Sequence, residues 1–264
     1  MYLPPAFDKA MALEAAALVN QAYDQFQQFK LGQAWNLAGN YNELGLLNAR
    51  PEWSLSHEPF GFVAQNRASG LVFIVYRGTE TPSDWLVDFT FPQVPQLPGA
   101  GNVESGFYGV YQQTAGSVAA AVARAGAKPN VIATGHSLGG ALAVLAAGDP
   151  VTSAAAGSLG LYTFAGPRTG DLAFAAAFNG RVRPAWRVVN TEDIVPTLPL
   201  ATPVLVGGSA PLILRLAQEL GQKLNYEHAG TAVCFTTHTG SIAGNHSMQV
   251  YIAAIQGAQA TAPA

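Results

Sequence analysis

The sequence predicts an α/β protein in which a mostly parallel central sheet is flanked by helices. Residues 71–76 (LVFIVY) form an unbroken apolar run of strand length, which is typical of a strand buried on both faces. Residues 131–140 (VIATGHSLGG) pass from a β-branched apolar run through a sharp turn into an alanine-rich helical pattern. Strand-like and helix-like segments alternate from residue 71 to residue 189, and this order favours parallel strands joined by crossover helices.

The individual elements follow from hydrophobic periodicity and from turn residues. Apolar residues at helical spacing predict a helix over residues 8–29, and residues 53–64 contain strand-like pieces with a turn at 59–61. The other elements expected before residue 200 are helices at 107–124, 138–147 and 171–178 and strands at 71–76, 131–134, 159–164 and 185–189. Beyond residue 200 we expect an amphipathic helix at 211–224, a strand or hairpin at 231–235 and a short terminal helix at 251–255.

The length and composition predict one domain spanning residues 1–264. Apolar residues make up 49% of the chain and charged residues 11%, so we expect a large core and a weakly charged surface. A net charge of −3 without any run of Lys or Arg disfavours nucleic acid as a partner. An apolar patch left exposed on such a surface would suit contact with a lipid–water interface.

Cys234 is the only cysteine, so the chain has no intrachain disulfide and no paired-cysteine motif. We expect this thiol to be buried in a strand. No cofactor or metal is expected, since no group of histidine and carboxylate residues has ligand spacing. No signal peptide is visible, and no stretch of about 18 apolar residues predicts a transmembrane segment. Localisation stays open between a cytoplasmic protein and a mature secreted form, and the oligomeric state is equally open.

Residues 135–139 match the pattern G-x-S-x-G in a strand–turn–helix context that can present a nucleophilic serine. In such a turn Ser137 has a strained backbone and projects its hydroxyl above the sheet, while the flanking glycines leave room for the helix. The same pattern occurs in plain turns, so the assignment of Ser137 depends on finding its partners.

A serine hydroxyl becomes a nucleophile when a histidine removes its proton and a buried carboxylate orients that histidine. Asp193 follows the strand expected at 185–189 and precedes apolar residues, so we expect it in a partly buried loop and take it as the acid. Glu192 is the neighbouring alternative, with a side chain expected to point toward solvent.

Among the five histidines, His246 lies in a loop just before the last expected helix. The chain order serine, acid, histidine of α/β hydrolases places the base there, and His228 is the alternative. His136 lies inside the turn of the nucleophile, where we expect its backbone to matter more than its ring. Thr79 directly follows the strand at 71–76, and its backbone N–H with that of Leu138 is expected to form the oxyanion hole.

Several motifs together resemble the class 3 lipases, the family that includes the secreted triacylglycerol lipases of filamentous fungi. The motifs that carry the resemblance are YRGT at 76–79, DWLVDF at 84–89, GHSLGGA at 135–141, YTFAGPRTG at 162–170 and DIVPTLP at 193–199. The similarity extends over roughly residues 60–251. It implies the α/β-hydrolase fold, with Ser137 as nucleophile, Asp193 as acid, His246 as base, and Thr79 and Leu138 as oxyanion donors.

This chain departs from the family in three respects. Segment 103–107 lacks the family's usual histidine before its Gly-Phe pair, the fungal members carry disulfides that this chain cannot form, and residues 200–225 look longer than the usual connection.

Two segments are candidates for a lid or for acyl-chain contacts. Residues 82–91 carry Trp85, Leu86 and Phe89 beside the oxyanion loop, and residues 200–225 carry Leu212 and Leu216 on one helical face. For both segments the alternative is a fixed helix packed on the core.

These residues predict a serine carboxylester hydrolase that cleaves lipid esters of the triacylglycerol type through an acyl-enzyme. An esterase acting on short-chain, feruloyl or phospholipid esters is the alternative within enzymes. A lipase-like binding protein without catalysis is the alternative outside enzymes, disfavoured because nucleophile, acid, base and oxyanion loop are all present.

Overall fold

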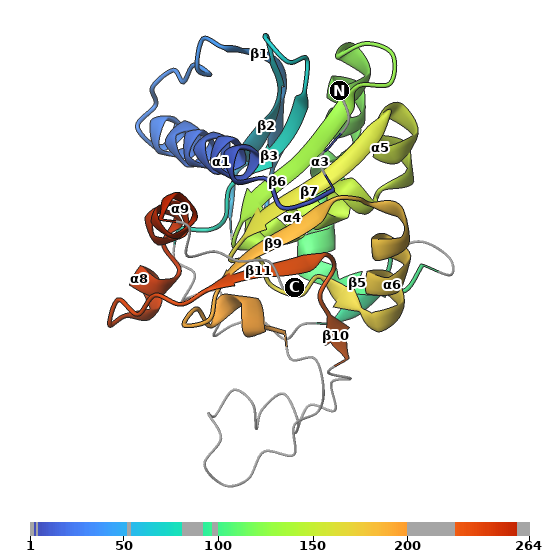
Figure 1. Cartoon of the computed structure of the whole chain (residues 1–264). Coiled ribbons are helices and arrows are strands. Elements are labelled where there is room, and N and C mark those ends of the chain that lie inside the picture. Colours follow the sequence, from blue (N-terminus) through green and yellow to red (C-terminus); the bar gives the residue numbers. More distant parts are fainter. Residues whose placement is uncertain are drawn as a thin grey trace, which may run out of the picture.

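The computed structural model describes residue 3 and residues 5–51, 54–80, 92–96, 100–199 and 225–257. Within these residues, seven strands form one sheet in the order β1-β2-β3-β6-β7-β9-β11 (Figure 1). The first two pairs in this order are antiparallel, and every pair from β3 to β11 is parallel. The predicted mostly parallel sheet is therefore confirmed. The strands are β1 (Tyr41–Ala49), β2 (Glu58–Asn66), β3 (Val72–Tyr76), β6 (Asn130–His136), β7 (Ser158–Phe164), β9 (Ala185–Asn190) and β11 (Thr231–Phe235).

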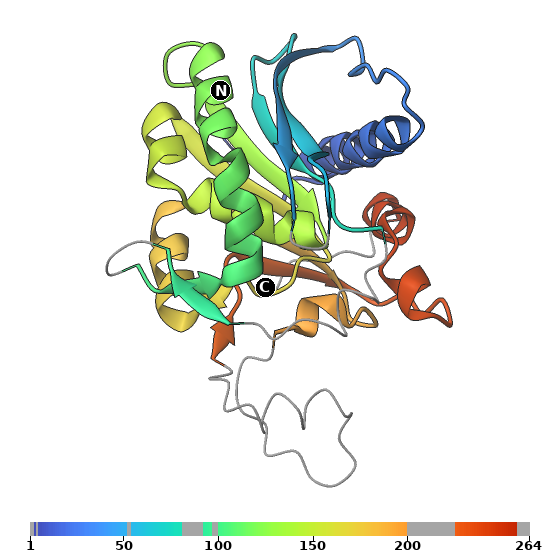
Figure 2. The same ribbon diagram turned by 180° about the vertical axis from the view of Figure 1, so that it is seen from behind.

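Helices cover both faces of this sheet (Figures 1 and 2). Helices α1 (Lys9–Lys30) and α9 (Met248–Gln256) pack on one face, against a core to which alternate residues of the strands contribute. The second core, on the opposite face, includes residues from three helices: α3 (Ser105–Arg124), α4 (Leu138–Gly148) and α6 (Leu172–Arg181). Helix α5 (Pro150–Ala155) packs against this core through Ala155. Because side chains alternate along a strand, β3 supplies both cores and all five of its residues are buried.

A second, smaller sheet lies at one end of the molecule. Its described strands run in the order β10-β8-β5-β4, which are Tyr226–Glu227, Gly170–Asp171, Asn102–Glu104 and Gln93–Pro95. The 3₁₀ helix η1 (Val195–Thr197) follows β9, and the short helix α8 (Ile242–Asn245) precedes α9.

The sequence-based prediction missed the short strands of the smaller sheet, and it was wrong at three places in the larger sheet. Strand β1 was not predicted, because two register shifts against β2 remove the alternation of buried and exposed residues that marks a strand. Residues 59–61 lie inside β2 and form no turn; Gly61 is needed there because a Cβ would lie 1.9 Å from the Val75 carbonyl oxygen on β3. Cys234 is exposed, since it alternates with the buried Val233 and Phe235 on β11.

The expected helices at 8–29, 107–124, 138–147 and 171–178 correspond to α1, α3, α4 and α6. Both lid candidates, including Trp85, Leu86, Phe89, Leu212 and Leu216, lie outside the described residues.

Helix α4 follows β6 so closely that Gly135 has no room for a side chain. A Cβ at this position would lie 2.1 Å from the carbonyl oxygen of Gly139, the second residue of the helix. We expect Gly135→Ala to lower the free energy of unfolding by more than about 3 kcal/mol, because backbone must shift to relieve the clash. Gly116→Ala is the matched control, since Gly116 lies on exposed α3 with nothing within 4 Å of its Cβ position. It should stabilise the protein by about 0.5–1 kcal/mol through helix propensity. Urea unfolding measures the free energy of unfolding of both variants. A decrease of less than about 1 kcal/mol in Gly135→Ala would contradict the packing argument.

Candidate active site

Ser137 lies at the turn between β6 and α4 and has an unusual backbone, with φ +57° and ψ −130°. Its N–H donates to the Phe164 carbonyl at 3.0 Å, which anchors the turn to β7. The residue is 1% exposed, and its Oγ has no hydrogen-bond partner within the part of the chain that is described. Leu138 begins α4, so its N–H is one of the helix-end donors without an intrahelical acceptor.

His246 and Asp193 form a buried hydrogen-bonded pair, as the sequence predicted. The Nδ1–H of His246 donates to Asp193 Oδ2 at 2.7 Å, and their side chains are only 2% and 0% exposed. This bond assigns the proton to Nδ1 and leaves Nε2 with a lone pair that can accept a proton. Among the described residues Nε2 contacts no hydrogen-bond partner.

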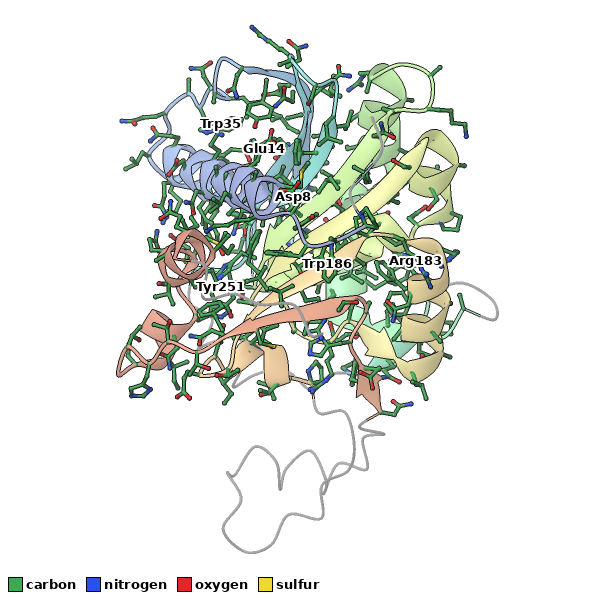
Figure 3. The ribbon with its side chains drawn as sticks, in the orientation of Figure 1. Asp8, Glu14, Trp35, Arg183, Trp186 and Tyr251 are labelled. Atoms are coloured by element: carbon green, nitrogen blue, oxygen red, sulfur yellow. The ribbon has the colours of Figure 1, made fainter. Side chains whose placement is uncertain are left out.

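Asp193 is oriented by two further donors. The Val195 backbone N–H donates to Oδ1 at 3.0 Å, and the Tyr251 hydroxyl donates to Oδ2 at 2.7 Å. Tyr251 comes from α9 (Figure 3). Its oxygen accepts the N–H of Asn190, the last residue of β9, at 3.1 Å. Burial raises the pKa of Tyr251 well above its ordinary value, so the hydroxyl keeps its proton and stays a donor.

Two asparagines, Asn190 and Asn245, hold the loops that carry Asp193 and His246. The Asn190 side-chain amide donates to the carbonyls of Thr237 and Asn245, at 2.9 and 3.0 Å. The Asn245 amide donates to the Glu192 carbonyl at 2.9 Å, and its oxygen accepts the Thr239 N–H at 2.7 Å. The sequence did not indicate either role, because the contacts join segments about fifty residues apart.

The loop after β3 lies directly against the serine. A Cβ on Gly78 would be 2.7 Å from Ser137 Cβ, so only glycine allows this approach. The Thr79 hydroxyl, next in the chain, is buried and lacks a partner among the described residues. Thr79 and Leu138 therefore both lie next to Ser137 in this part of the structure.

The side chain of Arg77 fixes the shape of the loop after β3. Its guanidinium donates to the carbonyls of Pro59 and Gly78 at 2.7 and 2.8 Å and pairs with Glu58 at 2.8 Å. The same group lies 3.6 Å from the ring centroid of Phe26 on α1, a cation–π contact. Burial lowers the pKa of Arg77, while the ion pair with Glu58 opposes this shift.

The ring of His136 connects the two halves of the site, contrary to our expectation that its backbone would matter more. Its Nε2 lies 2.8 Å from the His246 carbonyl oxygen, which can only accept, so Nε2 carries the proton. Burial lowers the pKa of His136 well below its ordinary value and keeps the ring neutral, so Nδ1 accepts from the Tyr23 hydroxyl at 2.7 Å. The Tyr23 oxygen in turn accepts the Gly78 N–H at 3.0 Å.

The alternative residues lie elsewhere. The side chain of Glu192 is 41% exposed, as expected, and pairs with the exposed His238 at 3.2 Å. His228 donates from Nε2 to the Pro196 carbonyl at 2.8 Å, and burial with nearby arginines lowers its pKa to about 2. In the described ranges, no three His, Cys, Asp or Glu residues group as a metal site, and no helix is long and apolar enough to cross a membrane.

Residues 73–202 match the family model described as Lipase (class 3). The chain is similar to a lipase of Rhizomucor miehei, with 36% identity over 157 residues, which cover 56% of this chain and 43% of that lipase. It is also similar to secreted mono- and diacylglycerol lipase 1 of Fusarium solani, at 32% identity over 55% of this chain and 44% of that protein. A chloroplastic phospholipase A(1) of Arabidopsis thaliana is 28% identical over 73% of this chain and 48% of its own length. The chain thus spans less than half the length of these curated relatives.

The structure resembles a solved structure described as a triacylglycerol lipase whose catalytic centre is formed by a serine protease triad. The TM-score is 0.65 at 25% identity, and the match covers 88% of this chain and 82% of the other. A Rhizomucor miehei lipase in complex with its propeptide has the same fold, with a TM-score of 0.63 over 89% of this chain and 71% of the other. The chain is thus similar to the class 3 lipase family and has the α/β-hydrolase fold.

Two histidines with lowered pKa values, the buried His136 and the half-buried His228, are expected to destabilise the protein in acid. Unfolded histidine takes up a proton near pH 6.5, whereas folded His228 stays neutral down to about pH 2 and folded His136 is shifted in the same direction. The unfolded state therefore binds more protons below pH 6.5, and stability falls as the pH drops, by up to about 1.4 kcal/mol per unit for each histidine. Between pH 7 and pH 5, we expect the free energy of unfolding of His228→Gln to fall by about 2 kcal/mol less than that of the unaltered protein. Denaturant unfolding at both pH values measures this difference, and His57→Gln is the control because His57 is exposed. An equal decrease in the free energy of unfolding of His228→Gln and His57→Gln would contradict the prediction.

Proposed function

We propose that this protein is a serine carboxylester hydrolase that cleaves lipid esters. Ser137 is the nucleophile, His246 the base and Asp193 the acid, and the backbone N–H groups of Thr79 and Leu138 stabilise the oxyanion. The observation that carries the proposal is the buried Asp193–His246 hydrogen bond, which leaves Nε2 of His246 available. The ring centroid of His246 lies 4.7 Å from that of His136, the residue directly before Ser137.

The reaction follows from these positions in two halves. As Ser137 Oγ attacks the ester carbonyl, its proton passes to His246 Nε2, and the negative charge on the carbonyl oxygen is met by the Thr79 and Leu138 N–H groups. The imidazolium then protonates the leaving alcohol, and the acyl group remains on Ser137. In the second half His246 takes a proton from water, the hydroxide attacks the acyl-enzyme, and the proton returns to Ser137 as the carboxylic acid leaves.

The environment of the base supports this cycle. Protonated His246 is stabilised by Asp193 at 2.7 Å, and the carboxylate is itself stabilised by the donors Tyr251 and Val195. The names of the relatives support lipid esters as the substrate, since they describe lipases, a mono- and diacylglycerol lipase and a phospholipase A(1). The relative described as secreted supports a secreted form of this protein.

Replacing the nucleophile gives the direct test. We expect Ser137→Ala to lower the kcat for p-nitrophenyl ester hydrolysis by at least about 10⁴-fold while the free energy of unfolding stays close to that of the unaltered protein. A series from C2 to C16 acyl chains measures this and separates a lipase from a short-chain esterase. Labelling with a fluorophosphonate should occur on the unaltered protein and not on the variant. A folded Ser137→Ala protein with near-normal hydrolysis would sink the assignment.

Tyr251 is expected to act as a positioning residue through Asp193. Tyr251→Phe should lower kcat about tenfold, roughly the worth of one hydrogen bond to a charged group, and leave KM unchanged. Tyr111→Phe is the matched control, because its buried hydroxyl likewise donates to an aspartate, Asp149, at 2.8 Å, away from the site. The two variants should lose similar stability and differ in kcat; equal kcat values would show that Tyr251 has no positioning role.

A further inference from the structure

A cavity of about 360 Å³ lies between α1 and the edge of the large sheet formed by β1 and β2. Gln25 and Phe29 line it from α1, Trp35 from the loop between α1 and β1, and Leu46 from β1. A volume above about 300 Å³ is typical of sites for small molecules. None of the three residues assigned to catalysis lines this cavity, so a ligand here would occupy a site of its own.

The side chain of Gln25 brings an unpaired hydrogen-bond acceptor to the cavity. Gln25 is 5% exposed, and its Oε1 has no hydrogen-bond partner among the described residues. Burying such an oxygen is unfavourable, because the group loses its hydrogen bonds to water and gains none in the protein. An apolar side chain would avoid this cost at the same place on α1. The amide therefore indicates a bound group that donates a hydrogen bond to it.

Two aromatic rings form apolar walls of the cavity. The ring of Trp35 packs against the buried Phe62 of β2, with the ring centroids 5.1 Å apart, and this contact holds the indole in place (Figure 3). Phe29 is 47% exposed and Leu46 is 43% exposed, although both are large apolar side chains on regular elements. A ring-shaped ligand packed on these side chains would remove apolar surface from water.

Polar side chains surround the same walls. Gln33, Glu43, Asn48 and His57 line the cavity, and all four are exposed. Together they offer amide donors and acceptors, one carboxylate and one imidazole. No Lys or Arg is among the described residues that line the cavity. The cavity is therefore equipped to bind several neutral hydrogen-bonding groups at once.

This combination of side chains discriminates between classes of ligand. An acyl chain would cover the two rings, but it would leave the Gln25 amide unpaired and remove the other amides from water. An anion would meet the carboxylate of Glu43 without a cation to balance it. A saccharide ring has a face of C–H groups that packs on an aromatic ring, and its hydroxyl groups both donate and accept hydrogen bonds.

We propose that this cavity is a binding site for a neutral saccharide of the size of a mono- or disaccharide. The sugar ring packs on Trp35 and Phe29, and one of its hydroxyl groups donates to Gln25 Oε1. Other hydroxyl groups bond to the amides of Gln33 and Asn48. The saccharide is bound and not cleaved, so the site is independent of the ester hydrolysis proposed above.

Titration of the full chain with glucose, cellobiose and maltose tests the proposal. We expect saturable binding of at least one of these sugars by isothermal titration calorimetry, and a shift of the Trp35 indole N–H resonance in the NMR spectrum. Gln25→Leu and Trp35→Ala should each weaken binding about tenfold, because each removes one of the main contacts. Trp35→Phe should restore part of the affinity, since it keeps an aromatic face. Gln28→Leu is the matched control, because Gln28 lies on α1 outside the cavity and its substitution should leave binding unchanged.

Stability measurements separate a ligand site from a structural role of Gln25. Because Gln25→Leu removes an unpaired buried group, the free variant should unfold at a urea concentration no lower than that of the unaltered protein. A clearly lower midpoint would assign the amide to the fold and would overturn the proposal.

The class of ligand is tested by the same titrations. Absence of saturable binding for all three sugars would overturn the saccharide site, and so would tighter binding of the cationic glucosamine than of glucose. Hydrolysis of p-nitrophenyl esters should be equal in Gln25→Leu and the unaltered protein. Failure of the saccharide site would therefore leave the proposed Ser137-dependent hydrolysis standing.

Discussion

The close approach of helix α4 to strands β3 and β6 is the constraint on which the site depends. Gly135 and Gly139 have no space for a Cβ, and a side chain on Gly139 would lie 2.5 Å from the Arg77 carbonyl oxygen. The turn between strand and helix is therefore forced to be tight, and Ser137 takes a backbone conformation that costs about 1–3 kcal/mol. Burial of every residue of α4 offsets that strain, so the hydrophobic core stabilises the conformation that Ser137 takes in this turn.

The other half of the site is held by polar contacts instead of apolar packing. Asp193, His246, Asn190 and Tyr251 are all buried, and each has hydrogen bonds to a partner on another segment. Burying a polar group without a hydrogen-bond partner is less favourable in free energy than burying an apolar group. Such a network therefore stabilises the fold when it is complete and destabilises it when one member is lost. This property makes the orientation of His246 insensitive to small motions of the loop that carries it.

Features carried by local patterns could be predicted from the sequence, and features carried by distant contacts could not. Ser137, Asp193 and His246 were predicted as site residues because each lies next to a recognisable element and the three occur in a known order along the chain. Tyr251 and the ring of His136 were missed, since their partners lie 58 and 110 residues away in the sequence and no spacing marks them. Strand β1 escaped prediction for a different reason, because its register shifts destroy the alternation that would identify it.

The chain of contacts from Gly78 through Tyr23 and His136 to His246 has a consequence for folding. It joins the first helix, the centre of the sheet and the last loop, so its members are separated by up to 223 residues in order of synthesis (246 minus 23). Contacts between residues so far apart in the sequence form late in folding, because the loop-closure entropy of the intervening chain must first be overcome. A nascent chain therefore contains the segment of Ser137 long before it can supply His246, and the two residues come together only when both cores are nearly assembled.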